Sequence, residues 1–129
     1  MAGGTGIGRV RGLGSARSGA LHWLQHRMSA LSNLVLMTWL MVSLLRLPAF
    51  DHATVVTWLG SPFAAVPMIL LIISVFTHLR LGLTVLIEDY VDNDASKFFL
   101  IILLNFYAIG AAALGIFSVA RIAFGAVDA

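Results

Sequence analysis

Apolar residues run along this chain in three long stretches that polar residues hardly interrupt. The first covers Met28–Leu45 and the third Phe98–Ala120, both without a charged residue, while the second, Pro62–Ile87, contains two basic side chains. At about 1.5 Å per residue, helices of these lengths are close to or longer than the roughly 30 Å of a bilayer hydrocarbon core. The pattern therefore predicts an all-α membrane protein with three transmembrane helices, at about 28–46, 62–87 and 98–120.

The polar remainder consists of an N-terminal arm and two short linkers. We interpret residues 1–27, which are basic and rich in glycine, as a cytoplasmic arm, and residues 28–129 as a three-helix membrane anchor. A signal peptide is not expected, because the apolar core begins too late and is too long. The arm also lacks acidic residues, as transit peptides do, which leaves a mitochondrial inner membrane as an alternative location.

The basic residues at the ends of the spans predict the orientation of the chain. Five lie on one side, at Arg9, Arg11, Arg17, Arg27 and Lys97, against two on the other side. Loops rich in lysine and arginine stay in the cytoplasm. We therefore expect a cytoplasmic N-terminus, a periplasmic C-terminus and a cytoplasmic turn at Glu88–Lys97.

Composition narrows the class of protein further. The chain has 129 residues, of which 60% are hydrophobic and 11% charged, whereas a soluble domain has about 25% charged residues. The lipid bilayer is therefore the main solvent, and a net charge of +2 gives no reason to expect a nucleic-acid partner. The absence of cysteine excludes iron–sulfur clusters, disulfides and thiol catalysis within this chain.

One histidine lies deep in the second span. On a helix, Ser74, His78 and Gly82 lie along nearly the same line, so a glycine leaves space next to the imidazole. A neutral imidazole can ligate haem iron, and haem is a flat, largely apolar group that fits such a space. The equally plausible structural interpretation is that another helix packs on Gly82 and that His78 bonds a neighbouring carbonyl.

The other histidines lie near the membrane surfaces. His22 and His26 are four residues apart at the cytoplasmic side, and His52 falls in the outer linker. The first two could ligate a metal from one helix face, although histidines next to Trp23 are more often headgroup-level residues. A haem held by two histidines would need its second ligand from another chain.

A second polar group lies where the second span reaches the cytoplasm. We expect Asp89 and Tyr90 there, with Arg27 at the same level. A tyrosine at this boundary can donate a hydrogen bond to a carbonyl ligand, and the carboxylate can relay protons. The alternative is a membrane-interface tyrosine, a solvated aspartate and an arginine that only sets topology.

Two motifs in the sequence resemble a known family. The stretch "HLRLGLTVLIEDYV" and the lead-in "GLGSARSGALHWLQHRMSA" are similar to the small hydrophobic membrane-anchor subunit of succinate dehydrogenase (complex II), in its alphaproteobacterial form. The resemblance implies a multi-pass protein of the bacterial inner membrane that takes part in succinate:ubiquinone oxidoreduction. Two departures concern the charge near the quinone pocket: His26 replaces a frequent glutamine, and Asp92 a frequent histidine.

The resemblance also implies cofactors, partners and site residues. It implies that His78 is an axial ligand of a b-type haem, with Gly82, Ser74 and Arg27 in the haem pocket and the second ligand on the large cytochrome b anchor subunit. It implies that Tyr90 binds ubiquinone, with Asp89 and Arg27 beside it. FAD and the iron–sulfur clusters belong to the flavoprotein and iron–sulfur subunits, where succinate is oxidised.

Two other functions remain alternatives at this point. One is a haem-free structural or proton-conducting membrane subunit, in which Arg80, Glu88 and Asp89 form contacts or a conduction path. The other is a fumarate reductase anchor that uses menaquinone. Arg80 could face a partner helix, a haem propionate or the headgroups, and Asn105 is expected to link helices by hydrogen bonding.

Overall fold

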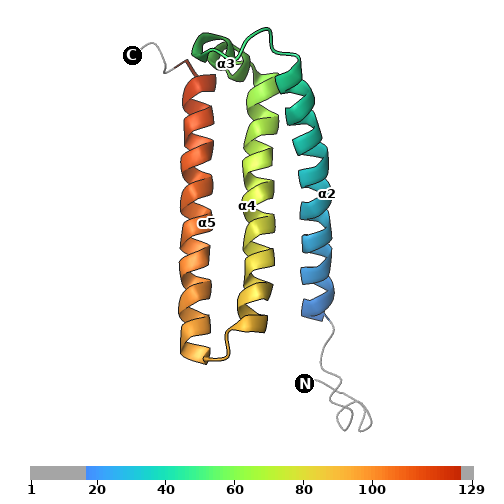
Figure 1. The fold of residues 1–129 in the computed structure, drawn as a ribbon, viewed down its shortest axis with the longest axis vertical. Helices are drawn as coiled ribbons and strands as arrows, with labels where there is room; N and C mark the ends of the chain where they lie inside the picture. Colours follow the sequence, from blue (N-terminus) through green and yellow to red (C-terminus); the bar gives the residue numbers. More distant parts are fainter. Residues whose placement is uncertain (1–16, 126–129) are drawn as a thin grey trace.

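The computed structural model describes residues 17–125, and this part of the chain is helical with no strand. Three helices, α2 (Arg17–Leu45), α4 (Pro62–Tyr90) and α5 (Asp94–Ala123), are long and apolar enough to cross a membrane (Figure 1). The predicted all-α architecture with three spans is confirmed. The orientation of the termini across the membrane stays a prediction.

The helix ends extend beyond the predicted spans. α2 begins at Arg17, so residues 17–27, expected in a cytoplasmic arm, continue the first helix, and the membrane-compatible segment starts at Gly19. The second long helix, α4, also continues beyond its predicted span, to Tyr90. The expected turn at Glu88–Lys97 is therefore reduced to the residues between Tyr90 and Asp94. Each long helix measures about 44 Å, enough to cross the headgroup layers as well as the hydrocarbon core.

A short helix, α3 (His52–Leu59), lies in the linker between the first two spans, where no helix was predicted. Asp51 caps it by accepting a hydrogen bond from the backbone N–H of Thr54, and hydrogen bonds from Thr54 lower the pKa of Asp51. Leu59 then packs into a small apolar cluster with Ala65 of α4 and Val119 of α5. α3 therefore closes one end of the α4–α5 pair (Figure 1).

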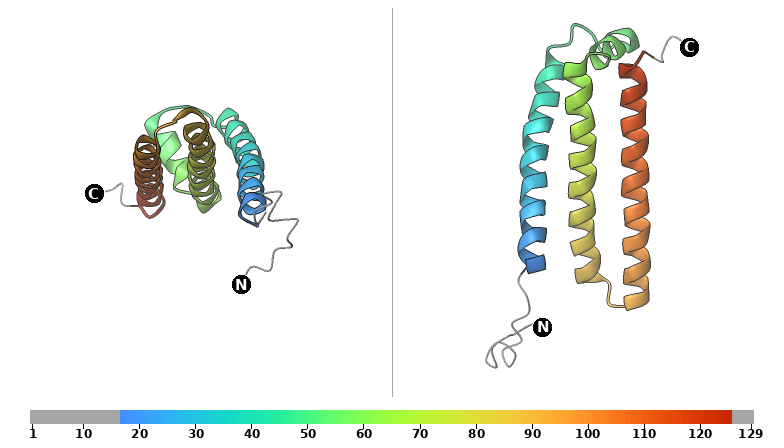
Figure 2. Two further views of the ribbon diagram at one scale, coloured as in Figure 1. Left: turned by 90° about the horizontal axis from the view of Figure 1, so that it is seen from below. Right: turned by 180° about the vertical axis from the view of Figure 1, so that it is seen from behind.

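The three long helices form an open row. α4 lies in the middle and packs against both α2 and α5, while α2 and α5 make no contact with each other within residues 17–125 (Figure 2). No large side chain in this part of the chain is fully buried. Lipid tails can cover apolar side chains, so an open row is compatible with the membrane, and it leaves two broad sides available to other chains.

Close approach of α5 to α4 depends on a glycine. A Cβ added at Gly115 would lie 3.3 Å from Cδ1 of Ile72. Small residues at helix interfaces allow backbones to approach in membranes, where van der Waals packing drives helix association. By contrast, a Cβ at Gly82 would meet nothing within 4 Å, so Gly82 is not a packing position within this chain.

Candidate functional site

His78 lies at the contact between α4 and α2, partly buried. Its Nδ1 is 3.0 Å from the hydroxyl oxygen of Ser29 on α2. The same hydroxyl donates to the backbone carbonyl of His26 at 2.9 Å. One nitrogen of the imidazole is therefore occupied by a bond within the chain, and Nε2 has no protein partner among the described residues.

The rings of His26 and His78 lie next to each other. Their centroids are 4.8 Å apart and their planes are inclined by 38°. We call the side of the helix row on which these two rings lie the histidine side. Rotation about α4 places Gly82 about 40° beyond His78, farther round on this side. The open space at Gly82 is thus next to the exposed part of the imidazole.

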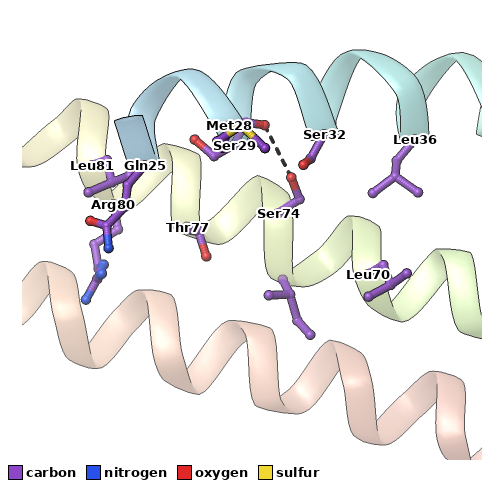
Figure 3. A pocket seen from close by; sticks show the side chains of 11 residues that line it. Gln25, Met28, Ser29, Ser32, Leu36, Leu70, Ser74, Thr77, Arg80 and Leu81 are labelled. Atoms are coloured by element: carbon purple, nitrogen blue, oxygen red, sulfur yellow. Dashed lines mark hydrogen bonds between the residues drawn. The ribbon is translucent and has the colours of Figure 1, made fainter. Parts of the chain in front are cut away.

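The opposite side of the α2–α4 contact is hollowed by a cavity of about 440 Å³. Ser74 points from α4 toward α2, where its hydroxyl donates to the carbonyl of Ser29 at 3.3 Å (Figure 3). Ser74 is 9% exposed and is therefore part of the helix contact. Ser74 was expected in the haem pocket next to His78, and that expectation stays a prediction; within this chain its hydroxyl bonds α4 to α2.

Arg80 extends from α4 toward α5 (Figure 3). Its Nη1 donates to Oδ1 of Asn105 at 3.2 Å, and Asn105 Nδ2 donates to the carbonyl of Ile101. Among the three locations considered for Arg80, the structure selects the neighbouring helix. The expectation that Asn105 links helices is confirmed.

Asp89 and Tyr90 form the end of α4, and both are exposed. Tyr90 has 80% of its surface accessible, and no hydrogen bond or ion pair joins either side chain to the rest of residues 17–125. The phenol and the carboxylate therefore face out of this chain, where a ligand or another subunit can reach them.

The structure does not bring Arg27 together with Asp89 and Tyr90. Ser29 is level with His78, so Arg27 lies roughly 15 Å along the helix axes from Tyr90. Its guanidinium lies over the ring of Trp23, 5.3 Å from the centroid. The expectation that the three residues share one level is therefore wrong, because α2 continues beyond Arg27 to Arg17.

Arg27 lies on the side of α2 that is directed away from α4, farther round the helix than His26. Counted from Ser29, which faces α4, His26 lies about 60° round α2 and Arg27 about 160° in the same direction. Arg27 is exposed, and it lies within a segment that can cross the membrane. A charged group in such a position is costly unless it finds a partner.

Ser29 was not identified from the sequence. This residue is one of two buried polar residues in the described part of the chain, with 7% of its surface exposed. A serine three residues after His26 gives no signal by itself, because the register between α2 and α4 decides what it touches. The possible metal pair His22 and His26 gains no third ligand: no group of three His, Asp or Glu side chains in residues 17–125 could hold an ion.

The sequence matches one protein family over most of its length. Residues 1–112 match the family described as succinate dehydrogenase/fumarate reductase transmembrane subunit. No solved structure is matched significantly.

Three curated relatives are named as succinate dehydrogenase hydrophobic membrane anchor subunits. A succinate dehydrogenase hydrophobic membrane anchor subunit of Rickettsia bellii (strain RML369-C) is 30% identical over 103 residues, which cover 80% of this chain and 82% of the relative. The subunit of the same name from Rickettsia conorii (strain ATCC VR-613 / Malish 7) is 30% identical over 104 residues, with the same coverage. That of Paracoccus denitrificans is 30% identical over 119 residues, or 92% of this chain and 91% of the relative.

Proposed function

Since the chain belongs to the family of succinate dehydrogenase/fumarate reductase transmembrane subunits, we propose that it binds a b-type haem jointly with a partner anchor and forms part of a ubiquinone-reduction site. The chain itself is a multi-pass membrane anchor of a bacterial dehydrogenase complex. The proposed partners are a large cytochrome b anchor, an iron–sulfur subunit and a flavoprotein subunit that contains FAD. In this assignment succinate is oxidised on the partner subunits.

The residues on the histidine side fit a haem. The supporting observation is the state of His78: its Nδ1 is engaged by Ser29 at 3.0 Å, while Nε2 is unpartnered. The open space at Gly82, one helical turn from His78, leaves room for a flat group on this side. A bound haem would supply a one-electron redox centre between the anchor chains.

The second axial ligand is assigned to another chain. His26 lies next to His78 with ring centroids 4.8 Å apart, so these two imidazoles would not hold one haem between them. His52 begins α3, at the other end of the helix row. A histidine of the large anchor subunit would therefore supply the second ligand. Arg27, exposed on the outer part of α2, is then available to a haem propionate.

The quinone site is assigned to the end of α4. Reduction of a quinone to its quinol takes up two electrons and two protons. The exposed phenol of Tyr90 donates a hydrogen bond to one quinone carbonyl and so holds the ring near the cytoplasmic surface. The carboxylate of Asp89, next to it and exposed, passes protons from water toward the reduced quinone. Electrons reach this position from the iron–sulfur subunit.

Two alternatives have less support. A proton-conducting role would use Arg80, but its guanidinium is bonded to Asn105 of α5. The family description covers fumarate reductase as well. The direction of the reaction in our proposal follows the succinate dehydrogenase names of the relatives, and the use of ubiquinone follows the resemblance of the two sequence motifs.

Replacement of His78 tests the proposal directly. We expect His78→Ala to abolish or strongly reduce the haem content of the purified complex, measured as haem per complex by the pyridine haemochrome spectrum. His52→Ala is the control, since it removes an imidazole at the other end of the helix row and leaves the proposed ligand and its neighbours in place. Full haem retention with an unchanged Soret band in His78→Ala would refute ligation by His78.

A further inference from the structure

Ser29 has an unusual set of contacts for a small side chain in a membrane helix. Its hydroxyl lies between the carbonyl of His26, at 2.9 Å, and Nδ1 of His78, at 3.0 Å. Its own carbonyl accepts the hydroxyl of Ser74 at 3.3 Å. Ser29 and Ser74 are the two buried polar residues within residues 17–125. The hydroxyl of Ser29 is thus held by the carbonyl of His26, and the backbone of Ser29 by Ser74, at the point where the hydroxyl meets the imidazole.

The number of protons available decides how the imidazole is bonded. A hydroxyl has one proton to donate and lone pairs to accept with. The carbonyl of His26 can only accept, so it takes the hydroxyl proton. Toward His78, Ser29 is then the acceptor, and Nδ1 of His78 must carry the hydrogen. In a neutral imidazole this leaves the lone pair on Nε2, the nitrogen with no partner in the described chain.

We propose that Ser29 is a positioning residue for the haem ligand, which fixes the tautomer and the ring orientation of His78. The inference rests on the proposed ligation by His78 and adds the residue that prepares it. Histidine ligands usually donate their second N–H to an oxygen, and this bond orients the ring and raises its basicity. Here that oxygen belongs to the neighbouring helix α2. Packing of α2 on α4 therefore brings the hydroxyl of Ser29 to Nδ1 of His78 and so orients the proposed ligand.

The ring of His26 contributes a second constraint. It lies 4.8 Å from the ring of His78 and limits its rotation on the histidine side. The hydroxyl of Ser29 is needed all the same, because a neighbouring ring restricts orientation without selecting which nitrogen holds the hydrogen. The tautomer is therefore assigned to Ser29 alone.

Removal of the hydroxyl gives a specific expected result in the purified complex. Ser29→Ala frees both the tautomer and the rotation of His78. Loss of such an outer partner typically weakens metal binding by about 10- to 100-fold. We expect faster loss of haem to a haem-scavenging apoprotein and an altered low-spin signal of the oxidised haem in electron paramagnetic resonance. We also expect a more positive midpoint potential, because the ligand donates less electron density.

Three further variants separate the hydroxyl from the packing. Ser29→Thr keeps a hydroxyl that can bond the carbonyl one turn earlier, so it should preserve the signal and the potential. Ser32→Ala removes the same group from α2 where it lines the cavity on the opposite side, and should change neither. Ser29→Cys keeps the side-chain volume with a weak hydrogen-bonding group, and replaces Ser29→Ala in the comparison if alanine prevents assembly.

The outcomes distinguish this inference from the proposed function. A wild-type resonance signal and potential in Ser29→Ala or, where alanine does not assemble, in Ser29→Cys would overturn the role of Ser29. An equal shift in Ser32→Ala would overturn it as well, since the effect would then be general to α2. Haem retained in His78→Ala would refute the ligation itself, whereas haem lost in His78→Ala with an unchanged Ser29→Ala would refute only the positioning.

Discussion

Gly82 offers the sharpest test of where a haem would lie. A Cβ at this position meets no atom within 4 Å of its own chain. Substitution should therefore leave the α2–α4–α5 row intact, and Gly82→Ala should even favour the helix by about 1 kcal/mol. If a haem covers this glycine, however, an added side chain intrudes into the space of the ligand.

The expected magnitude follows from packing. Inserting extra methyl groups into a filled contact costs about 1–3 kcal/mol, which corresponds to roughly 5- to 150-fold weaker binding. Gly82→Leu, which adds the larger volume, should be at the upper end of this range and Gly82→Ala at the lower end. The assay is the amount of haem per purified complex, together with the Soret spectrum.

A matched control is available on α5. Gly110 is also a helical glycine with nothing within 4 Å of an added Cβ, so Gly110→Leu makes the same change on a helix away from His78. We expect it to keep its haem. A wild-type haem content in Gly82→Leu would show that no haem lies over this glycine, and equal losses in Gly82→Leu and Gly110→Leu would point to impaired assembly.

Two further predictions concern the end of α4 and its contact with α5. Tyr90→Phe removes one hydrogen-bond donor, worth about 0.5–1.5 kcal/mol, and should lower kcat/KM for quinone up to roughly tenfold while dye-linked succinate oxidation stays unchanged; equal activity with quinone would rule out the phenol as a quinone donor. Asn105→Leu removes the acceptor of Arg80 and should lower the Tm of the purified complex, since such interhelical bonds contribute about 0.6–1.7 kcal/mol. The double variant with Arg80→Leu should recover that Tm, because no charge is then left unpaired; strictly additive losses would contradict this pairing.

The sequence was sufficient to predict the three spans, because long uncharged stretches leave few other possibilities. The helices extend beyond the predicted spans. Arg27 was expected just before the first span, but a single arginine on the exposed side of a helix does not end it, and α2 begins at Arg17. α3 was missed although Asp51 is a favourable capping residue, because eight residues between two spans give only a weak helical pattern.

The candidate site was predictable only in part. Periodicity within α4 grouped Ser74, His78 and Gly82, but it could not tell that Ser74 faces Ser29 while Gly82 faces open space. Those assignments depend on how α2 is placed against α4, which is a property of packing between helices. For the same reason the acceptor of Arg80 could not be chosen before Asn105 was located beside it.

The open row of helices has a consequence for how long an unassembled copy of this protein persists in the cell. Among the three long helices α2 and α5 each contact only α4, so the chain has two long-helix interfaces where a closed three-helix bundle would have three. An unassembled copy would expose an imidazole and an arginine to hydrocarbon, so subunits synthesised in excess should be short-lived substrates for membrane proteases. Degradation of copies that do not assemble would then match the number of anchor chains to the number of their partner subunits after translation.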